Sequence, residues 1–174
     1  MTVADKTATP TPLVGIVMGS DSDLEVMRGA AEALRKFEIP YEMTVASAHR
    51  SPQRAMTYAS EAESRGMKVI IAGAGHAAHL AGVLAAHTVL PVIGVPIDSS
   101  CLQGLDALLS TVQMPPGIPV ATVSIGKPGA RNAGILAAQM IALGDSAVTQ
   151  KLKGLKSEMA AQVEEKAHKI EHGG

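Results

Sequence analysis

Most of the residues in this sequence that could do chemistry lie in three short polar segments. Each segment directly follows an apolar run in the chain. They are 19–23 (Gly-Ser-Asp-Ser-Asp), 46–52 with a histidine beside an arginine, and 73–79, where small residues lead to a histidine. Hydroxyls, a guanidinium and a helix N-terminus suit a phosphate group. A nearby imidazole suits proton transfer at neutral pH. The residue types therefore indicate a phosphorylated ligand and acid–base chemistry.

The first segment offers hydroxyls and carboxylates ahead of an expected helix. Ser20 and Ser22 can donate hydrogen bonds, and the helix start would add free N–H groups and the positive end of its dipole. Asp23 could accept bonds from ribose hydroxyls. A local alternative is a capping box between Ser22 and Glu25. The segment lacks the glycine pattern of dinucleotide sites and the lysine of a P-loop.

The second segment places His49 beside Arg50. A guanidinium binds phosphate with a fork of donors, and an imidazole can act as general acid or base. A structural or surface histidine is the alternative. The neighbouring arginine and serines favour the functional interpretation. Ser51 and Pro52 suit the start of a helix.

The third segment begins with Gly73, Ala74 and Gly75, whose backbone N–H groups could hold a carboxylate or CO₂. We predict no metal, because no carboxylate or cysteine accompanies the histidines at 76, 79 and 87. His79 is expected to bond locally or to touch a ligand weakly. The only cysteine, Cys101, has no histidine near it in sequence, which argues against a nucleophile.

Composition narrows the class of protein. The 174 residues suit one domain, and 47% hydrophobic residues exclude a chain that is disordered throughout. Aromatic residues at 2% and a net charge of −1 argue against nucleic-acid or anionic-membrane partners. There is no apolar run long enough for a membrane span and no signal-peptide pattern at the start. A single cysteine fits a reducing compartment. We expect a soluble, cytoplasmic protein.

Apolar runs that alternate with helical patterns indicate βαβ units. Strands are expected at 13–18, 41–46, 68–72, 91–97 and 119–125, with helices behind the first three and at 128–143. This predicts an α/β three-layer sandwich with a five-stranded parallel, flavodoxin-like sheet. Ligands bind outside the carboxyl ends of such strands, so the three polar segments should share one edge.

The last segment, about 145–170, shows a helical stripe on a charged background, which continues the chain as an amphipathic helix. The stripe consists of Leu152, Leu155, Met159, Val163 and Ile170. It must be buried on its own domain or on a neighbouring subunit. We therefore expect a flexible tail at 1–12, an α/β domain at 13–144, and a C-terminal helix at 145–174 that either packs on its own domain or takes part in subunit assembly.

Taken in order, the motifs resemble the 5-(carboxyamino)imidazole ribonucleotide mutase family of purine biosynthesis, the class I PurE enzymes. The matching segments are 17–23, 47–52, 70–80, 91–96, 112–115 and 125–127. The resemblance implies a homo-octamer that moves a carboxylate from the exocyclic nitrogen to ring carbon 4, without metal or cofactor. It implies His49 as general acid and then base. It also implies substrate contacts from Ser20, Ser22, Asp23, Ser47, Arg50, Gly73, Ala74, Gly75 and Leu80.

One departure bears on the site. His76 stands where the family usually has glycine, and it could crowd the pocket, change its proton chemistry or point away. Three alternatives stay open. They are a carboxylase that adds CO₂ directly to aminoimidazole ribonucleotide, a carboxylase acting on a pyridine nucleotide, and a non-catalytic ribonucleotide-binding protein.

Overall fold

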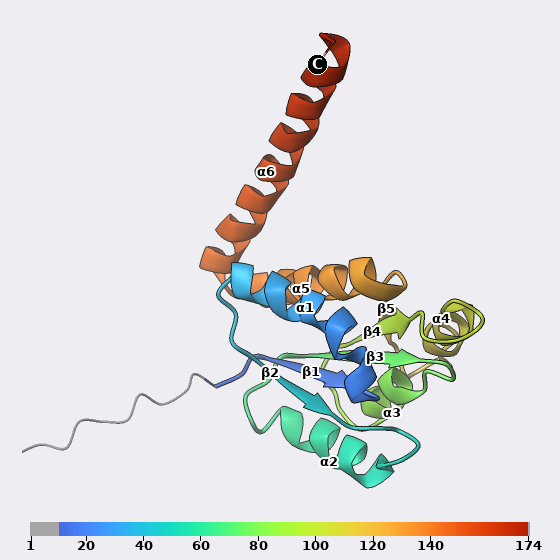
Figure 1. Ribbon diagram of the computed structural model, residues 1–174. Coiled ribbons are helices and arrows are strands. Elements are labelled where there is room, and N and C mark those ends of the chain that lie inside the picture. Colours follow the sequence, from blue (N-terminus) through green and yellow to red (C-terminus); the bar gives the residue numbers. More distant parts are fainter. Residues whose placement is uncertain (1–10, 174) are drawn as a thin grey trace, which may run out of the picture.

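The computed structural model describes residues 11–173, so the first ten residues of the expected tail lie outside the described part. Within it, one five-stranded sheet carries helices on both faces (Figure 1). The elements in chain order are β1 (Val14–Met18), the 3₁₀ turn η1 (Asp21–Asp23), α1 (Leu24–Lys36), β2 (Tyr41–Val45), α2 (Pro52–Ala62), β3 (Val69–Gly75), α3 (Leu80–Ala86), β4 (Val92–Ile97), α4 (Leu105–Val112), β5 (Ala121–Thr122), α5 (Gly126–Ala142) and α6 (Ser146–Glu171).

The sheet has the order β2-β1-β3-β4-β5, and every neighbouring pair is parallel. This confirms the predicted parallel, flavodoxin-like α/β fold. The chain runs from β1 outward to β2 and then returns to the other side of β1 with β3. At such a reversal the loops behind the two strands diverge and leave a crevice, where ligands bind in folds of this class.

Successive side chains of a strand point to opposite faces of the sheet, and this explains why the buried strands are continuous apolar runs in the sequence. Val14, Ile16 and Met18 of β1 pack in the cluster under α1 and α5, while Val17 packs in the cluster under α2 and α3. Because both faces are covered, every residue of β1 is buried. The sheet is therefore held rigidly, and the loops at its carboxyl edge are held with it.

Small residues set the distance between α1 and α5. A Cβ on Gly134 of α5 would lie 2.6 Å from the Ala30 carbonyl oxygen and 2.7 Å from Ala33 Cβ, both on α1. Glycine and alanine at this contact let the two helix backbones approach closely. This explains how a chain almost without aromatic residues still fills its core.

Three local predictions differ from the structure. β3 continues through Gly75, because β4 offers partners as far as Ile97, so the third polar segment begins as strand and only 76–79 forms a loop. The fifth strand is much shorter than expected, spanning Ala121–Thr122. The α4 helix was not predicted; it begins behind Gly104, and Ser100 Oγ donates a hydrogen bond to Asp106 in its first turn at 2.8 Å.

The predicted C-terminal helix is present as α6, which Asp145 caps by accepting bonds from the backbone N–H groups of residues 147 and 148. Val148 and Leu155 are buried against the α1 and α5 side of the core. Beyond them the helix projects away from the body (Figure 1). No helix among residues 11–173 is both long and apolar enough to cross a membrane.

Candidate active site

A cavity of about 540 Å³ opens at the carboxyl ends of β1, β2, β3 and β4. It brings together all three polar segments that the sequence singled out. Every predicted site residue except Gly73 lines it. The lining residues are Gly19, Ser20, Ser22, Asp23, Ser47, Ala48, His49, Arg50, Ala74, Gly75, His76, Ala77, His79, Leu80 and Ser99.

The loop behind β1 forms a 3₁₀ turn, and Ser20 caps it. The Ser20 hydroxyl accepts from the Ser22 backbone N–H at 3.4 Å, and the Ser22 hydroxyl lies 3.5 Å from the Asp23 carboxylate. The capping box that was the local alternative, between Ser22 and Glu25, is not formed. Glu25 instead accepts from Lys127 Nζ at 2.9 Å, because α5 packs alongside α1 and brings that lysine within reach. The serine hydroxyls thus remain at the cavity wall.

Asp23 is a buried carboxylate in this wall, with 5% of its surface exposed. Burial raises its pKa above the ordinary aspartate value. Hydrogen bonds from the Ser20 backbone and the Ser22 hydroxyl, and the charges of His76 and Arg50, act in the opposite direction. Its environment therefore favours donors that satisfy the carboxylate, such as sugar hydroxyls.

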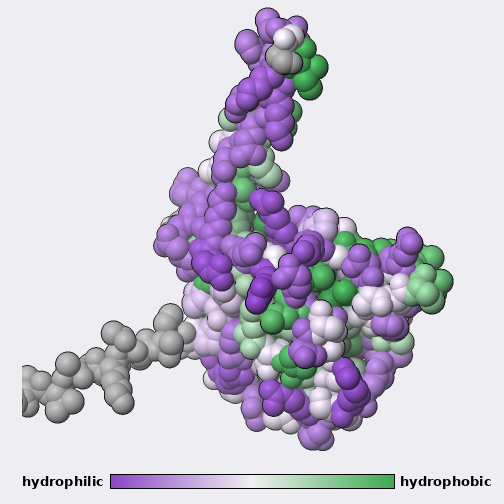
Figure 2. Space-filling model, in the orientation of Figure 1, coloured by the Kyte–Doolittle hydropathy of each residue, from purple (hydrophilic) through white to green (hydrophobic). Residues whose placement is uncertain are grey.

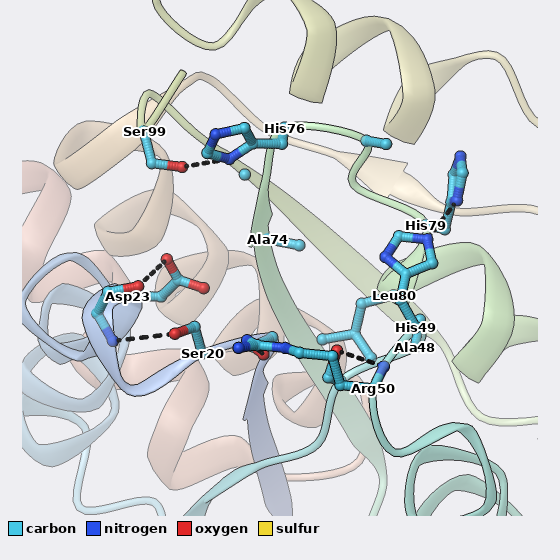
Figure 3. A pocket seen from close by; sticks show the side chains of 15 residues that line it. Ser20, Asp23, Ala48, His49, Arg50, Ala74, His76, His79, Leu80 and Ser99 are labelled. Atoms are coloured by element: carbon cyan, nitrogen blue, oxygen red, sulfur yellow. Dashed lines mark hydrogen bonds between the residues drawn. The ribbon is translucent and has the colours of Figure 1, made fainter.

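The loop behind β2 turns Arg50 across the end of β1. The Arg50 backbone N–H donates to Ser47 Oγ at 3.1 Å, and its Nη2 donates to the Gly19 carbonyl oxygen at 3.2 Å. Ser51 occupies the N-cap position of α2 as predicted, but its hydroxyl accepts from the Ser47 N–H at 2.9 Å. These bonds hold the guanidinium beside the Ser20 loop (Figure 3).

His49 and His79 form a hydrogen-bonded pair on the other side of the cavity. His49 Nε2 lies 2.8 Å from His79 Nδ1, with the ring centroids 5.0 Å apart and the planes at 76°. His79 is the N-cap residue of α3, and the buried Leu80 follows it. One ring must donate and the other accept, so the pair fixes the orientation of His49 and can hold or pass a proton.

The three small residues at the end of β3 have different surroundings. Ala74 and Gly75 reach the cavity, while Gly73 lies one step deeper and accepts from the Gly19 N–H at 3.0 Å. A Cβ on Gly73 would overlap Met27 Sδ. Packing against Met27 is thus a sufficient reason for glycine at position 73.

His76 has a left-handed backbone, with φ of 55°, and its Nδ1 lies 3.3 Å from Ser99 Oγ. Sequence reasoning missed Ser99 as a cavity residue. The signal was available, because Ser99 follows a predicted strand at the same edge of the sheet. His87, at the end of α3, and the exposed Cys101 do not line the cavity. Across residues 11–173, no three histidine, cysteine, aspartate or glutamate side chains gather as a metal site would need.

Known proteins match most of this chain. The profile of the AIR carboxylase family matches residues 13–162. N5-carboxyaminoimidazole ribonucleotide mutases from Pyrococcus horikoshii and Thermotoga maritima are 57% and 56% identical to it; each alignment covers 94% of this chain, with 91% and 94% of the respective relatives. A phosphoribosylaminoimidazole carboxylase from Candida glabrata is 53% identical, and this chain spans 28% of its length.

The solved structures agree with the sequence comparison. The crystal structure of Treponema denticola PurE superposes with a TM-score of 0.82 at 30% identity, covering 91% of this chain and 98% of that one. The family match extends over all the strands and over every loop that lines the cavity. The chain belongs to the AIR carboxylase family.

Proposed function

We propose that the chain is an N5-carboxyaminoimidazole ribonucleotide mutase of purine biosynthesis. It would convert 5-(carboxyamino)imidazole ribonucleotide to 4-carboxy-5-aminoimidazole ribonucleotide. The observation that carries the proposal is one cavity holding an oriented histidine pair, an arginine and a buried carboxylate. The mutases that cover nearly its full length, at 56–57% identity, support it.

The binding groups divide along the cavity. Arg50, Ser20 and Ser22 offer charged and neutral donors together for the phosphate, with Ser47 holding the Arg50 loop in place. Asp23 would accept from the ribose hydroxyls, which would satisfy a carboxylate that water reaches poorly. The imidazole ring would then lie over Ala74, facing the histidine pair.

His49 serves as general acid and then as general base. It delivers a proton to the carbamate nitrogen, the N–C bond breaks, and CO₂ and aminoimidazole ribonucleotide form in the cavity. Carbon 4 attacks the CO₂, and the neutral His49 removes the proton from that carbon. One proton is given and one is taken back, so the reaction consumes none. His79 positions the His49 ring through the 2.8 Å hydrogen bond.

Retention of CO₂ is a matter of proximity. The gas must meet carbon 4 before it escapes, and a small dry space raises its effective concentration. The buried Leu80 and the short side chain of Ala74 give this part of the wall an apolar surface, while Gly75 lets the backbone approach. The carbamate carries its own CO₂, so the proposed reaction involves no metal or cofactor.

The deciding experiment offers the purified protein two substrates. With 5-(carboxyamino)imidazole ribonucleotide, and with neither bicarbonate nor ATP, we expect rapid formation of the 4-carboxylated product. Formation of product only from aminoimidazole ribonucleotide plus bicarbonate would instead support direct carboxylation, the activity named for the fungal relatives. Binding of the ribonucleotide without turnover in either assay would indicate a non-catalytic protein.

His49→Asn tests the acid–base role. We expect turnover to fall by about 10²–10⁴-fold while ribonucleotide affinity changes little. His87→Asn is the matched control, because that histidine does not line the cavity. Retained turnover in the His49 variant would refute the assignment.

We propose further that the protein is a cytoplasmic homo-octamer, in which residues 145–174 act as an assembly element attached to the 13–144 domain. The support is the apolar stripe of the projecting α6, where Met159, Val163 and Ile170 are 37%, 63% and 81% exposed. Figure 2 shows apolar surface near the tip of this helix. The mass of the native particle measures the number of subunits, and a monomer would contradict the proposal.

A further inference from the structure

The Ser99 hydroxyl is built into the cavity wall. Ser99 follows β4, whose last residue, Ile97, pairs with Gly75 of β3. A Cβ on Gly75 would overlap the Ser99 hydroxyl oxygen and lie 3.2 Å from both Ser99 Cβ and the Ile97 carbonyl oxygen. The missing side chain at Gly75 is therefore what allows the hydroxyl to lie over the end of β3, inside the cavity.

His76 holds this hydroxyl at a cost to its own backbone. Its φ of 55° is unfavourable for a residue that has a Cβ, and such strain is concentrated at functional sites. In this conformation His76 Nδ1 lies 3.3 Å from Ser99 Oγ, which is within hydrogen-bonding distance. With Nδ1–H as donor to the hydroxyl oxygen, the hydroxyl hydrogen is free to be donated to a ligand.

The position of the Ser99–His76 pair determines which part of a bound ligand the pair contacts. Arg50 and Ser20 follow β2 and β1, whereas Ser99 follows β4, two strands beyond β1. Neighbouring strands lie ~4.8 Å apart, so Ser99 stands roughly 10 Å from the β1 end of the cavity. Figure 3 shows Ala74 between Arg50 and the Ser99–His76 pair. A nucleotide with its phosphate at Arg50 would point the far edge of its heterocycle toward this pair.

We propose that Ser99, positioned by His76, donates a hydrogen bond to the carboxylate that the reaction transfers. This inference rests on the proposed function, because that reaction puts a carboxylate on the far edge of the ring. Ser99 is then a specificity-determining residue that distinguishes carboxylated from uncarboxylated ribonucleotide. A hydrogen bond to a charged group of this kind corresponds to roughly a tenfold to hundredfold change in affinity.

The test compares two ligands on the full-length protein by calorimetric titration. One is 4-carboxy-5-aminoimidazole ribonucleotide, and the other is 5-aminoimidazole ribonucleotide, which lacks the carboxylate. For Ser99→Ala we expect at least about tenfold weaker binding of the carboxylated ligand and less than about twofold for the other. Ser64→Ala, at a serine outside the cavity that bonds the Glu61 carbonyl, is the matched control.

Gly75→Ala supplies a second variant that keeps the serine. Its new Cβ forces the Ser99 hydroxyl to rotate away, so the same selective loss is expected. Equal weakening of both ligands by Ser99→Ala, or no weakening of either in the two variants, would overturn the role of Ser99. Failure of the unmodified protein to bind or convert either ribonucleotide would overturn the proposed function itself, which separates the two failures.

Discussion

Replacing Gly73 with alanine should destabilise the fold and leave ribonucleotide affinity nearly unchanged. The resemblance to the mutases assigns Gly73 to substrate binding, but the structure places it below the cavity wall, against Met27. The substitution adds one methyl group on the side of β3 that faces α1. A measurement of stability therefore tests whether packing against Met27 requires the glycine, and a measurement of affinity tests whether substrate binding requires it.

The size of the effect follows from the contact with Met27, whose side chain is fully buried. The added Cβ would lie 2.9 Å from Met27 Cγ and Cε and would overlap the sulfur between them. Carbon atoms in normal contact are ~3.5–4.0 Å apart, so the methionine must withdraw by about 1 Å. Overpacking of this kind costs ~1–3 kcal/mol, and the flexibility of methionine favours the lower half of that range. For a chain of this length the expected fall in Tm is about 2–8 °C.

Urea unfolding measures the stability, and titration with the carboxylated ribonucleotide measures the affinity. Gly154→Ala is the control, because the same methyl group on α6 meets nothing within 4 Å. That variant should gain up to ~1 kcal/mol from helix propensity. Unchanged stability together with a clear loss of affinity for Gly73→Ala would refute the packing argument and restore Gly73 as a substrate contact.

Two further predictions concern the buried carboxylate and the projecting helix. Asp23→Asn should stabilise the fold at neutral pH and weaken ribonucleotide binding. Because burial raises the pKa of Asp23, its ionised form is a cost in the folded state. The stabilisation by Asp23→Asn should therefore be full above that raised pKa and should disappear as the pH falls through it. Urea unfolding at a series of pH values measures this stabilisation. A stabilisation that grows as the pH falls would contradict the reasoning. Val163→Asp should reduce the native mass without unfolding the subunit, since the side chain is 63% exposed; Gln162→Asp on the neighbouring exposed position is its control, and an unchanged mass would argue against assembly through the α6 stripe.

Local pattern was enough to predict the fold class. The apolar runs of β1, β3 and β4 became strands, because a strand covered on both faces needs apolar side chains on both. The residue at which β3 ends depended on the neighbouring strand β4 as well as on the residues of β3. Gly73, Ala74 and Gly75 have little preference for a strand, and they form one because β4 supplies hydrogen-bonding partners as far as Ile97.

The sequence was enough to predict most of the residues that reach the cavity, since polar side chains at the carboxyl ends of parallel strands share one edge; Ser99 was missed, and Gly73 lies below the wall. The contacts among those residues depend on how the chain folds in three dimensions. His49 and His79 are 30 positions apart and meet at 2.8 Å, because β2 and β3 flank β1. Asp23 is buried by its neighbours, and Ser99 occupies the space that Gly75 leaves open. These contacts join separate strand ends, so they depend on the spacing and register of the sheet, which no single segment of the chain encodes.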